Sequence, residues 1–575
     1  MGLIISLGFR IKTVCQLIML RKLIMRKGYN RWTWLYAALS LVGMVMWTYF
    51  QMRCPPELNI HRDPPRPVRS MKLSSNQVHT GDDQQVLVNR FFAARRVKTG
   101  IVELWRAFQN EILNIGGDTE KTRVLRKLKE RYNALLIDMD ELLSFDDQWR
   151  SELSKQATSE VAETISRLQN PEDCNGSRLS SDMIKCGFGC TMHSLVGRFD
   201  HAIAQNRRFI INGSQSDYSN GLDVITENFK PISSCPKENT EMAYVNSVCY
   251  MDGCDILNKT KEHSSNIQDY KYVHVSEIIS FHVDAFKPLG ASEQLWTKLV
   301  NFHGNPTAWW KGQLLRYIVR PNEAIGQMLE EKRAKIDFGE PLVGVHVRRT
   351  DKLVMPGENA EFHYFREYMK HVDDWYDRYE LQIRKLGAEH KIHRRVYLAT
   401  DDVSVWKKEL KSYSSYTFFG TREFSIAAGS SRSSRTSKNG LRGIITDISM
   451  LSNCNFLVCT FTSEVCKAAY ELKQTYSLDA SDDAISLDSM YGTVGLPNKP
   501  LKAVYDHTEN KTTSNMGFKP GDDVFIMKNL WNGTYDGWNG RTGNIGIFPS
   551  YKVQYEGKYC SNQSALFRTT FIRSD

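Results

Sequence analysis

Short apolar runs between Arg208 and Thr460 constrain the fold more than any other feature of this sequence. A strand with one face in water alternates apolar and polar residues, whereas a strand of a parallel sheet is buried on both faces and reads as a continuous apolar run. The runs are RFIIN (Arg208–Asn212), YVHV (Tyr272–Val275), LVGVHV (Leu342–Val347), VYLAT (Val396–Thr400) and NFLVCT (Asn455–Thr460). Because helical stretches separate them, they predict a Rossmann-like, doubly wound α/β domain over residues 171–500, with its ligand at the carboxyl ends of the strands.

A charge-free run from Trp32 to Met52 stands apart from this domain. It matches the roughly 20 apolar residues that a helix needs to span a bilayer, and aromatic residues lie near both of its ends. Lysines and arginines precede it, so we predict a cytosolic tail (1–31), a transmembrane signal anchor (32–52) and a luminal remainder. A cleaved signal peptide is the alternative, which the length of the run and the lack of a small-residue cleavage site disfavour.

Between this anchor and the α/β domain, the sequence predicts a stem and then helices. Residues 53–98 begin polar and proline-bearing, as expected of a stem. In residues 99–170, apolar side chains recur at spacings of three and four, which indicates amphipathic helices. A helix with one apolar stripe needs a partner surface, and we predict coiled-coil dimerisation. Packing on the chain's own α/β domain is the alternative.

The C-terminal residues 501–560 read as short strands with turns between them, followed by a tail over 561–575. The segments LKAVYDH, KPGDDVFIM, LWNGTYDGW and GNIGIFPSYKV resemble, in the right order, the landmarks of SH3 domains. The resemblance implies an all-β SH3-like barrel. His507 replaces the second tyrosine of the first landmark, which argues against ordinary peptide binding.

Charge and cysteine content narrow the function. The formal net charge of +10 is mild, and no basic block is dense enough for nucleic acid, so we expect an anionic small substrate or a membrane surface. The close pairs Cys186/Cys190, Cys249/Cys254 and Cys459/Cys466 would be bridged in an oxidising lumen. Zinc is the alternative, but the sequence lacks a Cys-x-x-Cys couple or a Cys/His tetrad.

The segment HVRRTDK (His346–Lys352) directly follows the apolar residues LVGV. Guanidinium and ammonium groups at the end of a buried strand can neutralise a diphosphate leaving group, and arginine can hold two phosphate oxygens at once. A surface cluster of ion pairs with Asp351 is the alternative. The sequence therefore predicts a diphosphate site here.

Several motifs together resemble the α-1,6-fucosyltransferases that fucosylate the core of N-linked glycans. Besides HVRRTDK they are the turn KCGFGC (Lys185–Cys190), NPTAWW (Asn305–Trp310), YLATDD (Tyr397–Asp402) and the stretch Leu441–Cys466. The resemblance runs from the anchor to the C-terminal unit. It implies a GT-B-like catalytic domain in the Golgi membrane that takes GDP-fucose as donor and an N-glycoprotein as acceptor. It also implies a homodimer formed through the helical region and the SH3-like unit.

The resemblance assigns roles to individual residues. Arg348 and Lys352 would contact the donor's diphosphate, Arg349 would be a further donor-site residue, and His346 and Asp447 would place the guanine. Further donor-site residues are implied: Ser463, Tyr218, Gly187, Gly189, Asp401 and Asp402. Gly187 and Gly189 would let the backbone approach the donor, and Asp401 and Asp402 would shape the site. Asp488 is the implied acceptor contact, and Cys174–Cys235 and Cys459–Cys466 are the implied bridges.

Two glutamates are candidates for the general base because this chain has an insertion, LVMPGENAEFH, after Lys352. The family places a glutamate shortly after that lysine, so Glu358 and Glu361 compete for the role. We favour Glu358, which begins an acidic-Asn-Ala step like the Glu-Ala-Ala of the family; at least one of the two is expected to be a solvated surface carboxylate. In a second departure, Glu464 stands where the family usually has glutamine.

The resemblance further implies that the enzyme needs no metal or cofactor. The only Asp-x-Asp string is Asp138-Met139-Asp140, inside a predicted helix. Arg348 and Lys352 would then replace a cation in a single displacement with inversion. Two other functions stay open at this level. One is a different GDP-fucose transferase, acting on protein Ser/Thr or on galactose; the other is a catalytically silent binding protein.

Overall fold

The computed structural model describes most of the chain from residue 81 to residue 554. The described residues are 81–113, 118–184, 186–212, 226–235, 243–246, 270–277, 288–354, 360–387, 392–422, 434, 436–491, 501–510, 512, 514–530 and 532–554. The predicted tail, anchor and most of the stem lie outside them. Within these ranges, no helix combines the length and the apolar character needed to cross a membrane.

A first parallel sheet has the order β2-β1-β4-β3. Its strands are β1 (Arg178–Asp182), β2 (Arg208–Asn212), β3 (Ala243–Asn246) and β4 (Tyr272–Glu277). The sequence did not predict β1, because its residues RLSSD are polar, yet all five are buried. Hydrogen bonds make this possible: Ser180 Oγ lies 2.9 Å from Nδ1 of His274, and Ser181 donates to the carbonyl of Val275 at 3.0 Å.

A second parallel sheet has the order β7-β6-β5-β8-β9. Its strands are β5 (Val343–Val347), β6 (Arg394–Thr400), β7 (Tyr416–Phe419), β8 (Phe456–Cys459) and β9 (Ala484–Ser486). All residues of β5 and β8 are buried, as the apolar runs predicted. The five predicted runs are therefore confirmed as parallel strands. They divide between two sheets, which their periodicity could not reveal, because it reports burial but not which strand is the neighbour.

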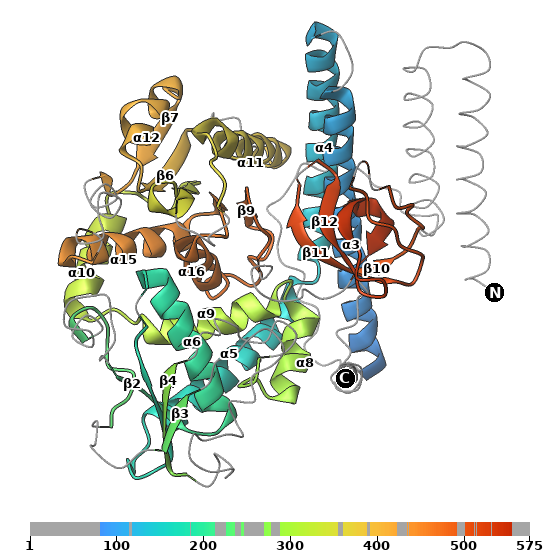
Figure 1. Cartoon of the computed structure of the whole chain (residues 1–575). Coiled ribbons are helices and arrows are strands. Elements are labelled where there is room, and N and C mark those ends of the chain that lie inside the picture. The colour runs from blue at the N-terminus through green and yellow to red at the C-terminus, as the bar shows by residue number, and fades with distance from the viewer. Residues whose placement is uncertain are drawn as a thin grey trace, which may run out of the picture. The chain divides into compact units, whose positions relative to one another are not determined.

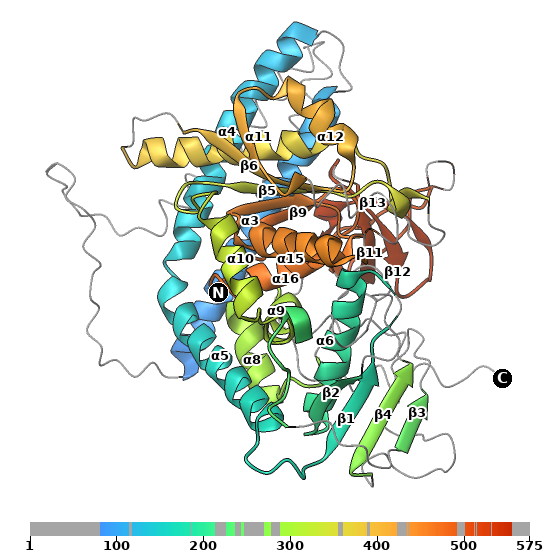
Figure 2. The ribbon, with the colours of Figure 1, turned by 90° about the vertical axis from the view of Figure 1, so that its left-hand side faces the viewer.

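Helices surround these sheets and fill the space between them. In two perpendicular views, α6, α9 and α16 lie between the first and the second sheet (Figure 1 and Figure 2). The helices of this part are α6 (Phe188–Ala204), α8 (Glu293–Phe302), α9 (Pro306–Ile318), α10 (Glu323–Arg333), α11 (Phe365–Lys385), α12 (Val403–Lys407), α15 (Lys438–Asn453) and α16 (Glu464–Lys473). The short 3-10 segments are Asp351–Leu353 and Glu409–Ser412. The side chains of Ser292, Asn305 and Asn322 cap α8, α9 and α10 by accepting a backbone N–H three residues on.

The N-terminal helices are α3 (Gly81–Leu113), α4 (Asp118–Ser144) and α5 (Asp147–Gln169). Because α3 begins at Gly81, residues 81–98 are helical, whereas we predicted stem as far as residue 98. These helices contact the chain's own α/β part: Lys129 of α4 pairs with Asp374 and Asp377 of α11 at 2.6 and 2.8 Å. The alternative that we gave for their apolar stripes, packing within the chain, is therefore observed; dimerisation is not tested.

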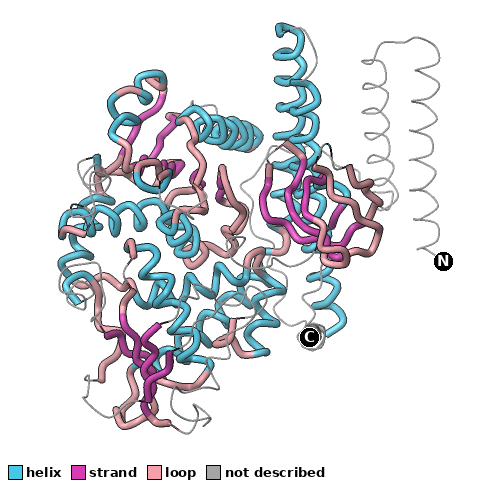
Figure 3. The backbone as a smooth tube through the Cα atoms, in the orientation of Figure 1, coloured by secondary structure: helices cyan, strands magenta, loops and turns pink. Residues whose placement is uncertain are grey.

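The C-terminal part forms one antiparallel sheet of order β13-β12-β11-β10-β14 (Figure 3). Its strands are β10 (Leu501–Ala503), β11 (Asp523–Asn529), β12 (Thr534–Asn539), β13 (Ile545–Pro549) and β14 (Val553–Gln554), with a 3-10 turn at Ser550–Lys552. It has its own apolar core, and the rings of Phe525 and Trp538 stack across two strands at 4.6 Å. At Gly533 an added Cβ would lie 2.9 Å from Cβ of Ala107, so this turn packs closely on α3.

Candidate active site

The carboxyl ends of three neighbouring strands bring together segments that are far apart in the sequence. Strand β5 pairs with β6 on one side and with β8 on the other, all in parallel. Arg348 follows β5, Asp401 follows β6, and Ser463 follows β8 by four residues. Parallel strands present their carboxyl ends at one edge, so these groups lie at one edge of the second sheet.

Arg348 points a partly buried guanidinium into this edge, where two carboxylates hold it. Its Nη1 pairs with Asp401, and its Nη2 lies 2.5 Å from Oδ1 of Asp351. Asp401 also accepts the backbone N–H of Arg349 at 2.9 Å. The end of β6 therefore orients the end of β5.

Arg349 lies deeper in the protein than Arg348. Its side chain is only 4% exposed, and its N–H groups bind Asp402 at 3.0 Å, Glu409 at 2.5 Å and the carbonyl of His363 at 3.0 Å. Burial alone would lower its pKa, but the two carboxylates outweigh burial and raise it. These contacts hold the segment around His363 against the end of β5. The sequence could not distinguish it from its neighbour Arg348.

His346 and Asp447 occupy buried positions near the same edge. Burial, with Arg348 nearby, lowers the pKa of His346 to about 3, so the imidazole is neutral. Its Nδ1 is buried and has no hydrogen-bond partner among the described residues. Asp447 on α15 accepts hydrogen bonds from Tyr397 and Thr421, both at 2.8 Å. A neutral histidine with an unused ring nitrogen can bind a further polar group.

Two helix N-termini converge at the junction of the two sheets. Gly187 is the N-cap of α6 and Ser463 is the N-cap of α16, and neither has a side-chain cap hydrogen bond. A Cβ at Gly189 would lie 2.8 Å from the backbone of Glu464, so the first turns of these helices touch. Gly189 is therefore required by helix packing, whereas a Cβ at Gly187 would meet nothing within 4 Å. The uncapped N–H groups of both helices form an anion-binding arrangement.

The structure also describes Lys352 and Asp488, two more of the predicted site residues. Lys352 lies in the 3-10 turn after Arg349, close in sequence to the strand end. Asp488 is 4% exposed, and it accepts hydrogen bonds from Thr462, from Ser486 at 2.8 Å and from the backbone of Ser489 at 2.5 Å. These bonds order its own loop.

Glu361 lies on the surface with its side chain 56% exposed, and its carboxylate pairs with Lys528 of β11. Glu358 and Tyr218 lie outside the described residues, so their predicted roles remain untested. The same is true of the Cys249–Cys254 bridge.

Three of the predicted disulfides are present: Cys174–Cys235, Cys186–Cys190 and Cys459–Cys466. Two of them flank the helix junction, since Cys186–Cys190 brackets the start of α6 and Cys459–Cys466 ties the end of β8 to α16. Both N-termini are therefore covalently braced. Cys454 is a buried thiol, and burial raises its pKa to about 12.

The sequence did not predict an ionic cluster that lies beside this junction. His193 of α6 lies between Glu464 and Glu471 of α16, with Nδ1–Oε2 and Nε2–Oε2 distances of 2.7 and 2.8 Å. The one available signal was Glu464, already noted as a departure from the family. Its partner could not be identified, because the two residues lie far apart in the sequence.

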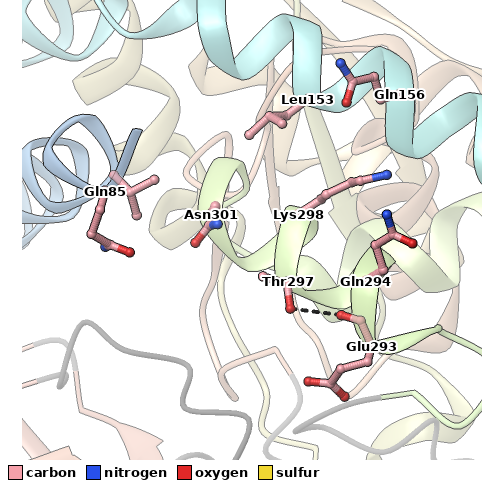
Figure 4. Close-up of a pocket in the computed structure, with 9 residues that line it drawn as sticks. Gln85, Leu153, Gln156, Glu293, Gln294, Thr297, Lys298 and Asn301 are labelled. Atoms are coloured by element: carbon pink, nitrogen blue, oxygen red, sulfur yellow. Dashed lines mark hydrogen bonds between the residues drawn. The ribbon is translucent and has the colours of Figure 1, made fainter. Parts of the chain in front are cut away.

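A cavity of about 670 Å³ lies elsewhere, between α3, α5 and α8 (Figure 4). Its lining mixes apolar side chains with amides, including those of Gln156, Gln294 and Asn301. Thr297 donates to the backbone carbonyl of Glu293 at 2.9 Å. None of the predicted site residues lines this cavity. Among the described residues there is also no cluster of three or more His, Cys, Asp or Glu side chains placed to hold a metal ion.

Comparison with known proteins agrees with these observations. A family described as "Alpha-(1,6)-fucosyltransferase N- and catalytic domains" matches residues 61–492. An alpha-(1,6)-fucosyltransferase of Drosophila melanogaster is 33% identical over 481 residues, covering 80% of this chain and 72% of the relative. One of Caenorhabditis elegans is 30% identical over 418 residues, covering 72% and 70%. A crystal structure of NodZ alpha-1,6-fucosyltransferase soaked with GDP-fucose aligns with 52% of this chain and 92% of its own, at 13% identity and a TM-score of 0.31, too low to support a conclusion.

Proposed function

The chain belongs to the alpha-(1,6)-fucosyltransferase family, and from this membership we propose that it transfers fucose from GDP-fucose to O6 of the innermost N-acetylglucosamine of N-linked glycans. The observation that carries the proposal is the position of Arg348. It lies at the carboxyl end of a fully buried strand, oriented by Asp401. We assign the two parallel sheets to the two halves of a GT-B-like fold, with the donor at their junction.

Fixed positive groups perform the task of stabilising the leaving group. As the bond between fucose and phosphate breaks, negative charge develops on the GDP diphosphate. Arg348 and Lys352 neutralise that charge from one side, and the N-termini of α6 and α16 add backbone N–H groups from the other. No metal ion is required in this scheme. The sugar passes through an oxocarbenium-like state in a single displacement with inversion.

A carboxylate must take the proton from the attacking hydroxyl group. We assign this role to Glu358. The ion pair between Glu361 and Lys528 favours this choice, because it holds the Glu361 carboxylate at the exposed surface. Lys528 belongs to the C-terminal sheet, which we assign to the SH3-like class from its sequence landmarks.

The sequence supports a proposal for the membrane topology and the compartment of the enzyme. We propose a single-pass type II protein of the Golgi membrane, anchored by residues 32–52 with its catalytic part in the lumen. The three disulfides support an oxidising compartment. The acceptor would then be an N-glycoprotein in transit, and a homodimer would form through the helical region and the SH3-like unit.

A defined acceptor tests the proposal. The full-length protein in detergent is incubated with GDP-fucose and a biantennary, GlcNAc-terminated glycopeptide, and GDP release is measured together with the product's linkage by mass spectrometry and fucosidase digestion. We expect α1,6-linked fucose on the innermost GlcNAc, and none with Arg348→Ala. Transfer to protein Ser/Thr or to galactose would replace the acceptor assignment. GDP binding without transfer to any of these acceptors would make the chain a binding protein.

A further inference from the structure

The ionic cluster at the helix junction links the two halves of the α/β part. Helix α6 packs on the first sheet, and α16 follows β8 of the second sheet. His193 bridges them, because its Nε2 hydrogen-bonds Glu471 at 2.8 Å and its Nδ1 lies at ion-pair distance, 2.7 Å, from Oε2 of Glu464 without a hydrogen bond. Figure 2 shows α6 and α16 next to each other. This is the contact at which the two uncapped N-termini meet.

Helix geometry explains why three residues meet here. Glu464 and Glu471 are seven positions apart, which places them on one face of α16, and His193 lies one turn after Gly189 on α6. The lack of a side chain at Gly189 lets α6 approach Glu464 closely. Gly312 likewise lets α9 approach α16, because a Cβ at this position would lie 2.1 Å from the carbonyl oxygen of Glu471. The close packing of three helices therefore encloses the cluster.

Two of the three side chains of the cluster are buried, and that of Glu464 is 30% exposed. His193 is 5% exposed and the Glu471 side chain only 1%. Burial alone would lower the pKa of His193, but Glu471 and Glu464 raise it to about 9, so the imidazole carries a positive charge at neutral pH. Other titratable groups face the cluster as well. Nζ of Lys467 lies 2.7 Å from Oε1 of Glu464, and the hydroxyl of Tyr491 donates a hydrogen bond to Glu471 at 2.6 Å. Lys311 lies over the ring of Tyr491, 5.7 Å from its centroid.

We propose that His193 is a positioning residue that, as an imidazolium between Glu464 and Glu471, sets the spacing of the α6 and α16 N-termini that receive the donor's diphosphate. The inference rests on the proposed donor site. Glu464 adjoins Ser463, the N-cap of α16, so the ion pair acts one residue from the proposed contact. Loss of the charge on His193 leaves two carboxylates facing a neutral ring, and the negative charge that remains lies close to where a diphosphate must bind.

The glutamate at position 464 gives this chain a property that a glutamine there would not supply. A second carboxylate stabilises the imidazolium, so the bridge persists to higher pH. Since the pKa is raised above the ordinary value of about 6.5, the stabilisation is complete below that pH and is lost as pH rises through about 9. Nucleotide affinity should follow the same course.

The experiment measures GDP affinity by titration calorimetry on the full-length protein and on His193→Gln. We expect Kd for GDP to rise about tenfold in the variant at neutral pH, which is within the usual range of coupling between sites. Between about pH 8 and pH 10 the wild-type Kd should rise towards that of the variant. Titration of the nucleotide itself is common to both proteins and cancels in the ratio. Equal Kd values over the whole range, from a variant with the wild-type circular dichroism spectrum, would overturn the proposal.

Glu464→Gln tests the same proposal independently, and it can be used if His193→Gln does not fold. It keeps the shape of the side chain and removes one of the two carboxylates that stabilise the His193 imidazolium. The pH at which GDP affinity falls should therefore shift downwards. An unchanged midpoint would also overturn the proposal. Tyr491→Phe is the matched control, since it alters the surroundings of Glu471 without touching His193 and should keep the wild-type midpoint.

A failure of the proposed function can be told from a failure of this inference. If the wild-type protein does not bind GDP at all, the donor site is wrong, and the bridge is then tested by thermal unfolding. In that case the melting temperature of the wild type should fall above about pH 9, whereas that of His193→Gln should not. If GDP binds and the variant behaves as the wild type, only the inference about His193 fails.

Discussion

Asp401 holds Arg348: its carboxylate pairs with the guanidinium and also accepts the backbone N–H of the next residue, Arg349. The side chain of Asp401 is 6% exposed and that of Arg348 is 16% exposed, so solvent screens the pair only weakly. The relationship joins two adjacent strand ends and determines where the positive charge lies.

Replacing Arg348 should slow the reaction more than replacing Asp401, the carboxylate that orients it. For Arg348→Ala we expect kcat/KM for GDP-fucose to fall by about 100-fold or more, the usual cost of losing a preorganised group that stabilises transition-state charge. Asp401→Asn keeps the arginine but loosens it, and should cost about tenfold. Steady-state GDP release measures both. Arg366→Ala removes an exposed arginine that stacks on Tyr364 and should have the wild-type rate. A wild-type rate for Arg348→Ala would refute the site.

Gly187 and Gly189 should respond differently to alanine. At Gly189 the new Cβ would collide with the backbone of Glu464, so we expect overpacking to lower the stability by about 1–3 kcal/mol. At Gly187 the Cβ meets no protein atom, so the melting temperature should stay unchanged while GDP affinity falls if the donor approaches there. Differential scanning calorimetry and GDP titration of the two variants separate these effects. A Gly187→Ala protein with the wild-type Kd would place the donor farther from this turn.

Replacing each of the two candidate bases by glutamine shows which of them acts in the reaction. Glu358→Gln should lower kcat by about 100-fold or more without changing KM for GDP-fucose, because a missing general base affects the chemical step. Glu361→Gln should leave kcat nearly unchanged, because its carboxylate is bound to Lys528 at the surface. The pH profile of kcat supplies the second readout, since only the true base removes its acidic limb when replaced. The opposite pattern would assign the base to Glu361.

The contact between the N-terminal helices and the α/β part depends on Asp479. Arg150 of α5 lies 2.6 Å from its Oδ2 and Arg95 of α3 lies 3.0 Å from it, with the side chains of Asp479 and Arg150 only 8% and 6% exposed. Arg150→Ala leaves the buried Asp479 paired with Arg95, and Asp479→Asn leaves the buried Arg150 paired with Asp147. Each variant loses one charge-assisted hydrogen bond and should lower the free energy of unfolding by about 2 kcal/mol. Urea unfolding measures it. Lys385→Ala breaks an exposed pair with Asp138 and should leave the unfolding midpoint unchanged.

Metal removal tests how the diphosphate is neutralised. If arginine, lysine and helix N-termini carry that charge, turnover should survive an excess of EDTA. GDP release is measured before and after chelation. Complete loss of activity that a divalent cation restores would contradict this mechanism.

The sequence by itself determined five of the parallel strands, the class of fold and the family. Burial on both faces leaves a continuous apolar run, and this local signal placed five parallel strands and located HVRRTDK at the end of β5. The three bridged cysteine pairs were also readable, two from their close spacing and Cys174–Cys235 from the resemblance. The strands and the two closely spaced cysteine pairs can be read from the sequence because each depends on neighbours along the chain.

Only the tertiary structure decided how these pieces meet. Strand β1 escaped prediction because its polar residues are satisfied by β4, and the roles of Arg348 and Arg349 diverged according to which acids surround them. The bridge from His193 to Glu471 joins residues 278 positions apart. Periodicity along a chain reports which face of an element is buried. Which charge stands opposite a buried group depends on helix packing between two sheets, and that contact is made only when the whole α/β part has folded.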